Sequence, residues 1–127
     1  MAESYPEDLK YHQEHDWARI DGDVAKMGIT WFAQDALGEV VFFDPPEVGA
    51  QVSKDQPYAE VESVKAVSDV VAPLSGEIVE VNETLADAPE QINEDPYGGG
   101  WMVKVRVSNV DEVDQLMDVS DYEGTLT

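Results

Sequence analysis

Apolar and polar residues alternate along short runs that cover most of the chain, and turn-forming residues separate these runs. Alternation with a period of two is typical of strands that bury one face. The predicted strands, in chain order, cover residues 24–30, 39–44, 58–63, 67–72, 76–82 and 102–107. Pro45, Pro46, Pro73 and the three glycines at 98–100 fall between these segments, where turns are expected. The pattern therefore predicts a mainly β protein.

Two short helices interrupt the strands. Thr30 is suited to cap a helix over residues 31–37, and Gly38 is suited to end it. Near the C-terminus, apolar positions share one helical face at Val110, Val113, Leu116 and Met117. Asn109 followed by Glu112 has the spacing of a capping box. We therefore expect one C-terminal helix, over about 110–117, that closes the domain.

Two predicted strands, 58–63 and 67–72, are separated only by Val64, Lys65 and Ala66. So short a connection predicts a hairpin with Lys65 at its tip. A lysine there is exposed and reachable while the turn holds its backbone, which is the geometry needed to attach a mobile group. From the hairpin alone, an ordinary solvated turn lysine is the simpler interpretation.

The composition bounds the kinds of site that the chain can build. The chain has 127 residues, of which 43% are hydrophobic. That size is typical of one domain with its own core, so we expect residues 1–127 to form a single domain. The absence of cysteine excludes disulfides, iron–sulfur clusters, thiolate zinc sites and a cysteine nucleophile.

The charge balance is strongly acidic. Asp and Glu number 28 against 7 Lys and Arg, which gives a formal net charge of -21. Such a surface repels nucleic-acid phosphates and anionic membranes, so neither is expected as a partner. The acids are spread along the chain among apolar residues, which argues against an acidic disordered tail. We interpret them as a halophilic surface, suited to salt that screens its self-repulsion.

The first residues lack the basic start and apolar run of a signal peptide. No stretch approaches the roughly 18 apolar residues that a membrane span requires. We therefore expect a cytoplasmic protein.

Candidates for catalysis are few. His12 and His15 are the only histidines, and no third metal ligand is patterned near them. No serine occupies a nucleophile-elbow pattern, and no Lys-Ser or Lys-Thr follows the glycines at 98–100 as a phosphate-binding loop needs. We expect no metal, no catalytic residue and no autonomous enzyme activity.

The segment around the hairpin tip carries a family resemblance. Glu62, Ser63, Val64, Lys65 and Ala66, in that order, resemble the lipoylation motif of glycine cleavage H proteins. Further matching motifs occur in the family's order, at residues 11, 15–17, 28–30, 33–34, 37–39, 46–49, 72–73, 75–77, 81–83, 93–97 and 100–102. The resemblance runs from about Tyr11 to about Trp101 and continues more loosely to Tyr122.

This resemblance implies a fold and a cofactor. H proteins are barrel–sandwich hybrids, like other lipoyl and biotinyl carriers, with two antiparallel sheets and short helices. Lipoate is attached covalently to the lysine that matches Lys65. The resemblance thus implies a carrier component of one-carbon metabolism and glycine catabolism, and not an enzyme in its own right.

The implied partners are the other proteins of the glycine cleavage system. Glycine decarboxylase, a pyridoxal-phosphate enzyme, loads the lipoyl arm with an aminomethyl group. The aminomethyltransferase passes the one-carbon unit to tetrahydrofolate, and dihydrolipoyl dehydrogenase then reoxidises the arm. A lipoylating enzyme attaches the cofactor, and the carrier itself is expected to be a monomer.

H proteins are understood to shelter the loaded arm in a cleft beside the modified hairpin. The carboxylates of this chain that match that region are Asp16, where the family usually has Glu, and Asp69. A carboxylate facing the cationic amine of the arm would form a charge-assisted hydrogen bond. The alternative interpretation is that both are ordinary surface acids in an acidic chain.

The residues that flank the lysine distinguish this chain from other families of carrier proteins. Biotinyl carriers usually place it between two methionines, whereas Val64 and Ala66 flank Lys65 here. Lipoyl domains of 2-oxoacid dehydrogenases usually have Asp in the place of Val64. An H-like protein that donates lipoate to other enzymes keeps the same motif and stays open, as does an unmodified acidic binding module.

Overall fold

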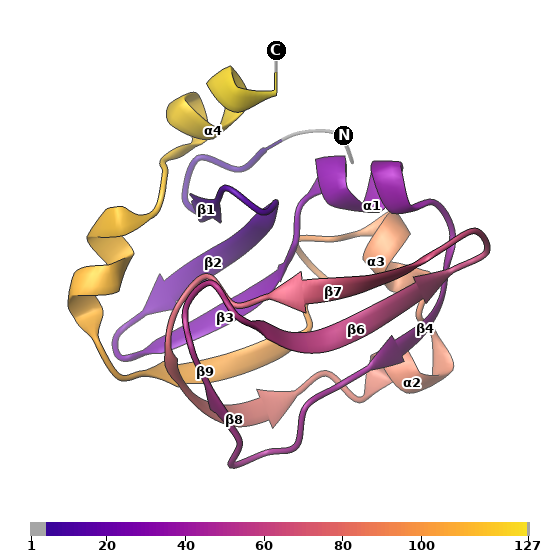
Figure 1. Cartoon of the computed structure of the whole chain (residues 1–127), viewed down its shortest axis with the longest axis horizontal. Helices are drawn as coiled ribbons and strands as arrows, with labels where there is room; N and C mark the ends of the chain where they lie inside the picture. Colours follow the sequence, from indigo (N-terminus) through magenta and orange to yellow (C-terminus); the bar gives the residue numbers. More distant parts are fainter. Residues whose placement is uncertain (1–4, 127) are drawn as a thin grey trace.

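The computed structural model describes residues 5–126, which form a mainly β fold with short helices (Figure 1). The strands are β1 (Lys10–His12), β2 (Asp16–Asp21), β3 (Val24–Ile29), β4 (Val40–Asp44), β5 (Gln51–Val52), β6 (Pro57–Ser63), β7 (Val67–Val71), β8 (Gly76–Val81) and β9 (Val103–Val107). The helices are α1 (Trp31–Leu37), α2 (Thr84–Asp87), α3 (Gln91–Glu94), a 3₁₀ helix η1 (Val110–Gln115) and α4 (Val119–Thr125). None of the helices within 5–126 is long and apolar enough to cross a membrane.

The strands form two antiparallel sheets. The larger sheet has six strands in the order β1-β2-β3-β9-β8-β5, and the smaller has three in the order β4-β6-β7. Every neighbouring pair is antiparallel. The predicted class, two antiparallel sheets with short helices, is therefore confirmed, as are all six predicted strands within a residue or two of their ends. The sequence pattern missed the short strands β1 and β5 and the strand β2.

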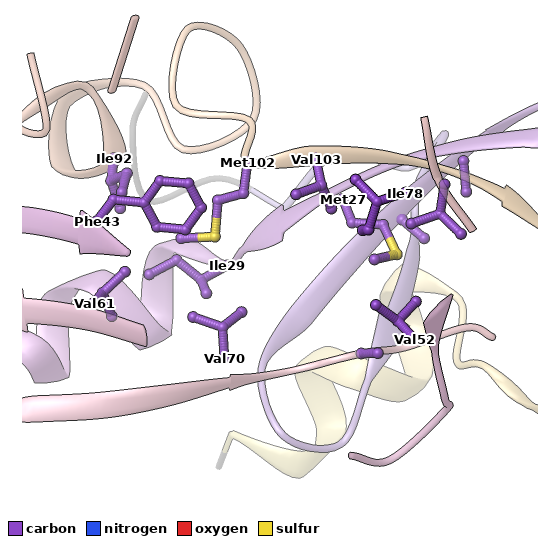
Figure 2. Close-up of a cluster of buried hydrophobic side chains, with 14 of the residues drawn as sticks. Met27, Ile29, Phe43, Val52, Val61, Val70, Ile78, Ile92, Met102 and Val103 are labelled. Carbon is purple, nitrogen blue, oxygen red and sulfur yellow. The ribbon is translucent and has the colours of Figure 1, made fainter. Parts of the chain in front are cut away.

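The core lies between the two sheets. Figure 2 shows side chains of both sheets meeting there, with Met27 and Ile78 from the larger sheet and Phe43, Val61 and Val70 from the smaller. All five are at least 97% buried. Each such side chain contributes about 1.5–3 kcal/mol relative to an exposed position. The sandwich thus fixes the smaller sheet, which carries the Lys65 hairpin.

A second buried cluster joins the two ends of the described chain. Its fully buried aromatic members are Tyr11, Trp17 and Tyr122. The rings of Tyr11 and Tyr122 stack with centroids 4.7 Å apart and planes 8° apart. The backbone of Tyr11 also pairs with Met117 through two hydrogen bonds of 2.8 Å. These contacts hold α4 against β1, as Figure 1 shows.

The C-terminal helix differs from the prediction. Residues 110–115 form the 3₁₀ helix η1, and the α-helix that closes the fold is α4, which the sequence pattern missed. Asn109 does cap η1, accepting from the Asp111 N–H. Glu112 does not complete a capping box: its carboxylate accepts from the backbone N–H of Ser75 at 2.7 Å and from its hydroxyl at 2.9 Å. This contact to a distant turn replaces the local one that the spacing suggested.

Candidate functional site

Lys65 lies exposed in the turn that joins β6 to β7, so the predicted hairpin is confirmed. Buried Ser63 organises this turn. Its hydroxyl oxygen accepts from the backbone N–H groups of Lys65 at 3.2 Å and Ala66 at 3.0 Å, and its own N–H donates to the Ala66 carbonyl at 2.8 Å. The backbone under Lys65 is therefore held by several hydrogen bonds while the side chain extends outward.

The hairpin tip also rests on the segment that follows α1. The Val64 N–H donates to the Glu39 carbonyl at 3.0 Å. The aliphatic part of Lys65 crosses Gly38, where an added Cβ would lie 3.1 Å from the Lys65 Cε. Within residues 5–126, the Lys65 ammonium forms no ion pair. Its amine therefore remains available for acylation.

The Gly38 turn is itself braced from a distant part of the chain. The side-chain amide of Asn93, on α3, donates to the Gly38 carbonyl and to the Gln34 side chain, both at 2.9 Å. Its oxygen accepts from the Val40 N–H at 2.8 Å. Gly38 has a φ of +89°, a conformation that favours glycine. These contacts fix the surface on which Lys65 lies.

The remaining motif residues surround the lysine without enclosing it. Val64 is 68% exposed and Val67 is 61% exposed. Glu62, on β6, stands opposite Phe42 of β4 on one side and Val67 of β7 on the other. Lys65 therefore projects from a tip with exposed apolar neighbours, and Glu62 lies near the end of the strand that leads into the turn.

A cleft of about 440 Å³ opens beside the hairpin. Its walls come from the loop before β2, from α1, from the end of the Lys65 turn and from β7. The lining residues are Glu14, His15, Phe32, Ala33, Ala36, Leu37, Ala66, Val67, Ser68, Asp69 and Val71. Most of these side chains are apolar, and the two carboxylates come from different segments, Glu14 from the loop before β2 and Asp69 from β7. The cleft can therefore hold a hydrocarbon chain that carries a cationic end.

Asp69 lines this cleft. It is exposed, on β7, and it stands opposite Glu60 of β6, which stands opposite Asp44 of β4. No ion pair within residues 5–126 involves any of the three. Asp69 is thus a carboxylate with neighbours of its own charge, suited to attract a cation.

Asp16 has a different environment, so the structure does not bring the two predicted carboxylates together on the cleft surface. Asp16 is 2% exposed and is not among the lining residues. Burial, followed by the charge of Glu14, raises the pKa of Asp16 well above its ordinary value. Its Oδ2 has no hydrogen-bond partner within residues 5–126, and the nearest basic atom is Nδ1 of His12 at 4.0 Å. The buried Tyr58 hydroxyl also lacks a partner within residues 5–126, and burial, followed by the charge of Asp16, raises the pKa of Tyr58.

His15 lies in the cleft wall; the sequence indicated it as part of a motif shared with the family and as a possible metal ligand, and predicted no role for it in a cleft. Its Nδ1 is 2.8 Å from the Tyr122 hydroxyl, and its ring centroid is 4.5 Å from that of Phe32. His15 has a φ of +72°, which is uncommon for a residue other than glycine. Burial lowers the pKa of His15, against a smaller opposing effect of Glu14. The partner that reveals its placement is 107 residues away in sequence, so no local signal could have shown it.

His12 does not line this cleft. Its Nε2 lies 2.6 Å from Asp55, and its Nδ1 accepts from the Glu14 N–H at 3.0 Å. The two histidines therefore have separate partners, and no group of three potential metal ligands occurs within residues 5–126.

Comparison with known proteins agrees with this geometry. The sequence profile of the family described as "Glycine cleavage H-protein" matches residues 9–127. A glycine cleavage system H protein of Carboxydothermus hydrogenoformans is 51% identical over 95% of this chain and 93% of its own length. That of Bacillus subtilis is 49% identical, with 94% of each chain covered. A crystal structure of the Mycobacterium marinum H protein superposes with a TM-score of 0.88 at 43% identity, covering 96% of this chain and 98% of that one. The chain belongs to the glycine cleavage H-protein family.

Proposed function

We propose that this chain is the lipoyl carrier of a glycine cleavage system, with lipoate attached to Nζ of Lys65. One observation carries the proposal: an exposed lysine, without an ion pair among residues 5–126, stands on a braced hairpin tip beside a cleft with apolar walls and carboxylates. A lysine that is only a solvated turn residue needs neither the Ser63 hydrogen bonds beneath it nor a cleft beside it.

The residues of the cleft fit a lipoyl arm. When bound, lipoate supplies a dithiolane that accepts the aminomethyl group and is later reoxidised. Phe32, Leu37 and Val71 present apolar surface to the hydrocarbon part of such an arm. Asp69 and Glu14 present negative charge to its amine, since an amine attached to the arm is cationic at neutral pH.

Asp16 supports the same proposal from inside the protein. Its Oδ2 is buried without a hydrogen-bond donor in the described part of the chain, and such atoms are rare in native proteins. Asp16 follows directly after His15, which lines the cleft. We infer that a cationic amine entering past His15 supplies the donor that Asp16 lacks, while Asp69 meets the amine at the surface. The two carboxylates thus act at different positions along the path of the arm, and each slows hydrolysis of the aminomethyl group where it meets the amine.

The partners follow from the same role. Glycine decarboxylase loads the arm, the aminomethyltransferase unloads it, dihydrolipoyl dehydrogenase reoxidises it and a lipoylating enzyme attaches it. The chain supplies attachment, placement and shelter and carries out no bond-breaking step of its own. A monomeric, cytoplasmic carrier with an exposed hairpin is free to visit each enzyme in turn.

Glycine decarboxylation–exchange tests this function. The lipoylated protein should support exchange between labelled bicarbonate and the carboxyl group of glycine when glycine decarboxylase is added. Lys65→Arg keeps the charge but cannot be acylated by the same chemistry, so we expect it to abolish the exchange. Lys104→Arg, on the far strand β9 and paired with Glu80, is the matched control and should retain full activity. Exchange that survives in Lys65→Arg would overturn the proposal.

A further inference from the structure

We propose that His15 is an arm-binding residue of the cleft, whose neutral imidazole donates a hydrogen bond from Nε2–H to the lipoyl arm. Tyr122, on α4, fixes which ring nitrogen carries the proton. This assignment deepens the proposed function and rests on the attachment of lipoate to Lys65.

The position of the ring is set from several sides. Its backbone is in the left-handed region, with the His15 N–H donating to the His12 carbonyl at 2.9 Å and the His15 carbonyl accepting from the Thr30 N–H at 3.0 Å. The ring then rests on Phe32 of α1. A non-glycine residue at positive φ is a strained position that the surrounding structure must enforce. Here the strain directs an imidazole into the wall of the cleft.

A chain of hydroxyl groups determines the tautomer. The Thr30 oxygen accepts from the Ala33 N–H at the start of α1, so the hydroxyl proton of Thr30 is free to donate. Its partner is the Tyr122 oxygen, 2.8 Å away, and the Tyr122 proton then points to Nδ1 of His15, also at 2.8 Å. The opposite direction would leave the proton of fully buried Thr30 without an acceptor. Nδ1 is therefore an acceptor, and the neutral ring carries its proton on Nε2.

The neutral form is supported by the surroundings of the ring. Burial opposes its protonation and lowers the pKa of His15. The acidic residues near it are Glu14, which precedes it in the chain, Asp69, which lines the same cleft, and buried Asp16, which follows it in the chain. His12 lies on the adjoining strand β1 and opposes a positive charge on His15.

The Nε2–H group has no hydrogen-bond partner within residues 5–126. The arm offers two neutral acceptors, the carbonyl oxygen of its amide and its sulfur atoms. Its cationic amine cannot accept and is left to the carboxylates. A neutral donor can thus orient the arm without repelling the amine, which a protonated imidazole or a lysine at this position would do.

Two substitutions of His15 distinguish the role of Nδ1 from the role of Nε2. His15→Asn keeps an amide near the Nδ1 position, where it can still bond Tyr122, and removes the donor at Nε2. His15→Gln reaches the Nε2 position with an N–H donor but gives up the bond to Tyr122. A purely structural role depends on the Tyr122 bond, whereas arm binding depends on the Nε2 donor.

Thiol alkylation reports the position of the arm. The chain contains no cysteine, so every thiol belongs to the arm. The lipoylated protein is loaded with glycine and glycine decarboxylase, the enzyme is removed, and the rate at which iodoacetamide alkylates the remaining thiol is followed by intact mass. We expect alkylation of His15→Asn to be about two- to tenfold faster than wild type, the factor that one hydrogen bond supplies. His15→Gln should stay close to wild type.

Nitrogen-15 NMR of the imidazole side chains gives a second readout that needs no loaded arm. With two histidines in the chain, His12→Asn assigns the signals. At pH 8, His15 should be the Nε2–H tautomer in wild type and a mixture of tautomers in Tyr122→Phe. On loading, the Nε2 signal should shift and the Nδ1 signal should stay.

Three results would overturn the assignment of His15. They are a wild-type alkylation rate in His15→Asn, equal acceleration in both variants together with an equal loss of melting temperature, or an Nδ1–H tautomer in wild type. Failure of the proposed function looks different, because a chain without lipoate on Lys65 has no thiol to alkylate at all.

Discussion

The side chain of Lys65 lies across Gly38, so closely that a Cβ at position 38 would come 3.1 Å from the Lys65 Cε and 3.8 Å from Nζ. The end of α1, where the φ of Gly38 is +89°, therefore forms the surface on which the attachment lysine rests. The backbone conformation favours glycine at this position, and an added Cβ would also displace the flexible end of the Lys65 side chain.

Gly38→Ala should accordingly destabilise the fold by about 1–3 kcal/mol and slow lipoylation of Lys65. The backbone strain explains the first effect and displacement of the lysine the second. Gly22→Ala is the matched control, because Gly22 also has positive φ but has no atom within 4 Å of an added Cβ. Urea unfolding and the initial rate of lipoylation measure the two effects. If Gly22→Ala slows lipoylation as much as Gly38→Ala, the contact with Lys65 is not the cause.

Asp16→Asn should stabilise the unmodified protein at pH 8 by about 1–3 kcal/mol, because it removes an unpartnered buried carboxylate. The pKa of Asp16 is raised in the folded state, so the native protein binds its proton more tightly than the unfolded chain does. The penalty for ionising it is absent below the unfolded pKa of about 3.9, grows as pH rises toward the raised folded pKa and is constant above it. Urea unfolding between pH 5 and pH 8 should therefore show an advantage of Asp16→Asn that increases with pH. An advantage that is constant with pH would contradict this account.

Asp69→Asn should release ammonia from the loaded arm faster than wild type. The increase should be about two- to fivefold, since an exposed charge contact contributes little. Asp44→Asn is a matched control: Asp44 is exposed in the same row of the same sheet but does not line the cleft. Asp16→Asn should also accelerate release if its carboxylate meets the amine. Equal rates in wild type, Asp69→Asn and Asp16→Asn would show that these carboxylates do not guard the arm.

The stability of the fold should depend on salt. A net charge of -21 opposes compaction, and molar salt shortens the screening length to about 3 Å. The row of Asp44, Glu60 and Asp69 places part of this repulsion on adjacent strands. Melting temperature should rise with ionic strength, and Glu60→Lys should raise it at low salt and flatten the dependence. A melting temperature indifferent to salt would count against a halophilic surface.

The features that the sequence predicted depend on contacts between residues close together in the sequence. Thr30 caps α1 through the Ala33 N–H three residues later, and the Lys65 turn is closed by Ser63 within its own hairpin. Such contacts follow from local spacing, so the pattern of residue types is enough to locate them.

The parts that it did not predict depend on distant contacts. Glu112 is the residue that the capping pattern expected to bond locally, and it bonds Ser75 instead. His15 is placed by Tyr122 on a helix that the pattern missed. The burial of Asp16 likewise results from the packing of β2 and could not be distinguished from surface exposure in a chain with 28 acidic residues.

Peptide mapping after enzymatic lipoylation tests the central claim most directly. Two other lysines form ion pairs, Lys54 with Asp55 and Lys104 with Glu80. Lys65, in contrast, is exposed on its hairpin. The account predicts one lipoyl adduct per chain, on the peptide that contains Lys65, and none on Lys65→Arg. An adduct on Lys54 or Lys104, or a second adduct that persists in Lys65→Arg, would contradict it.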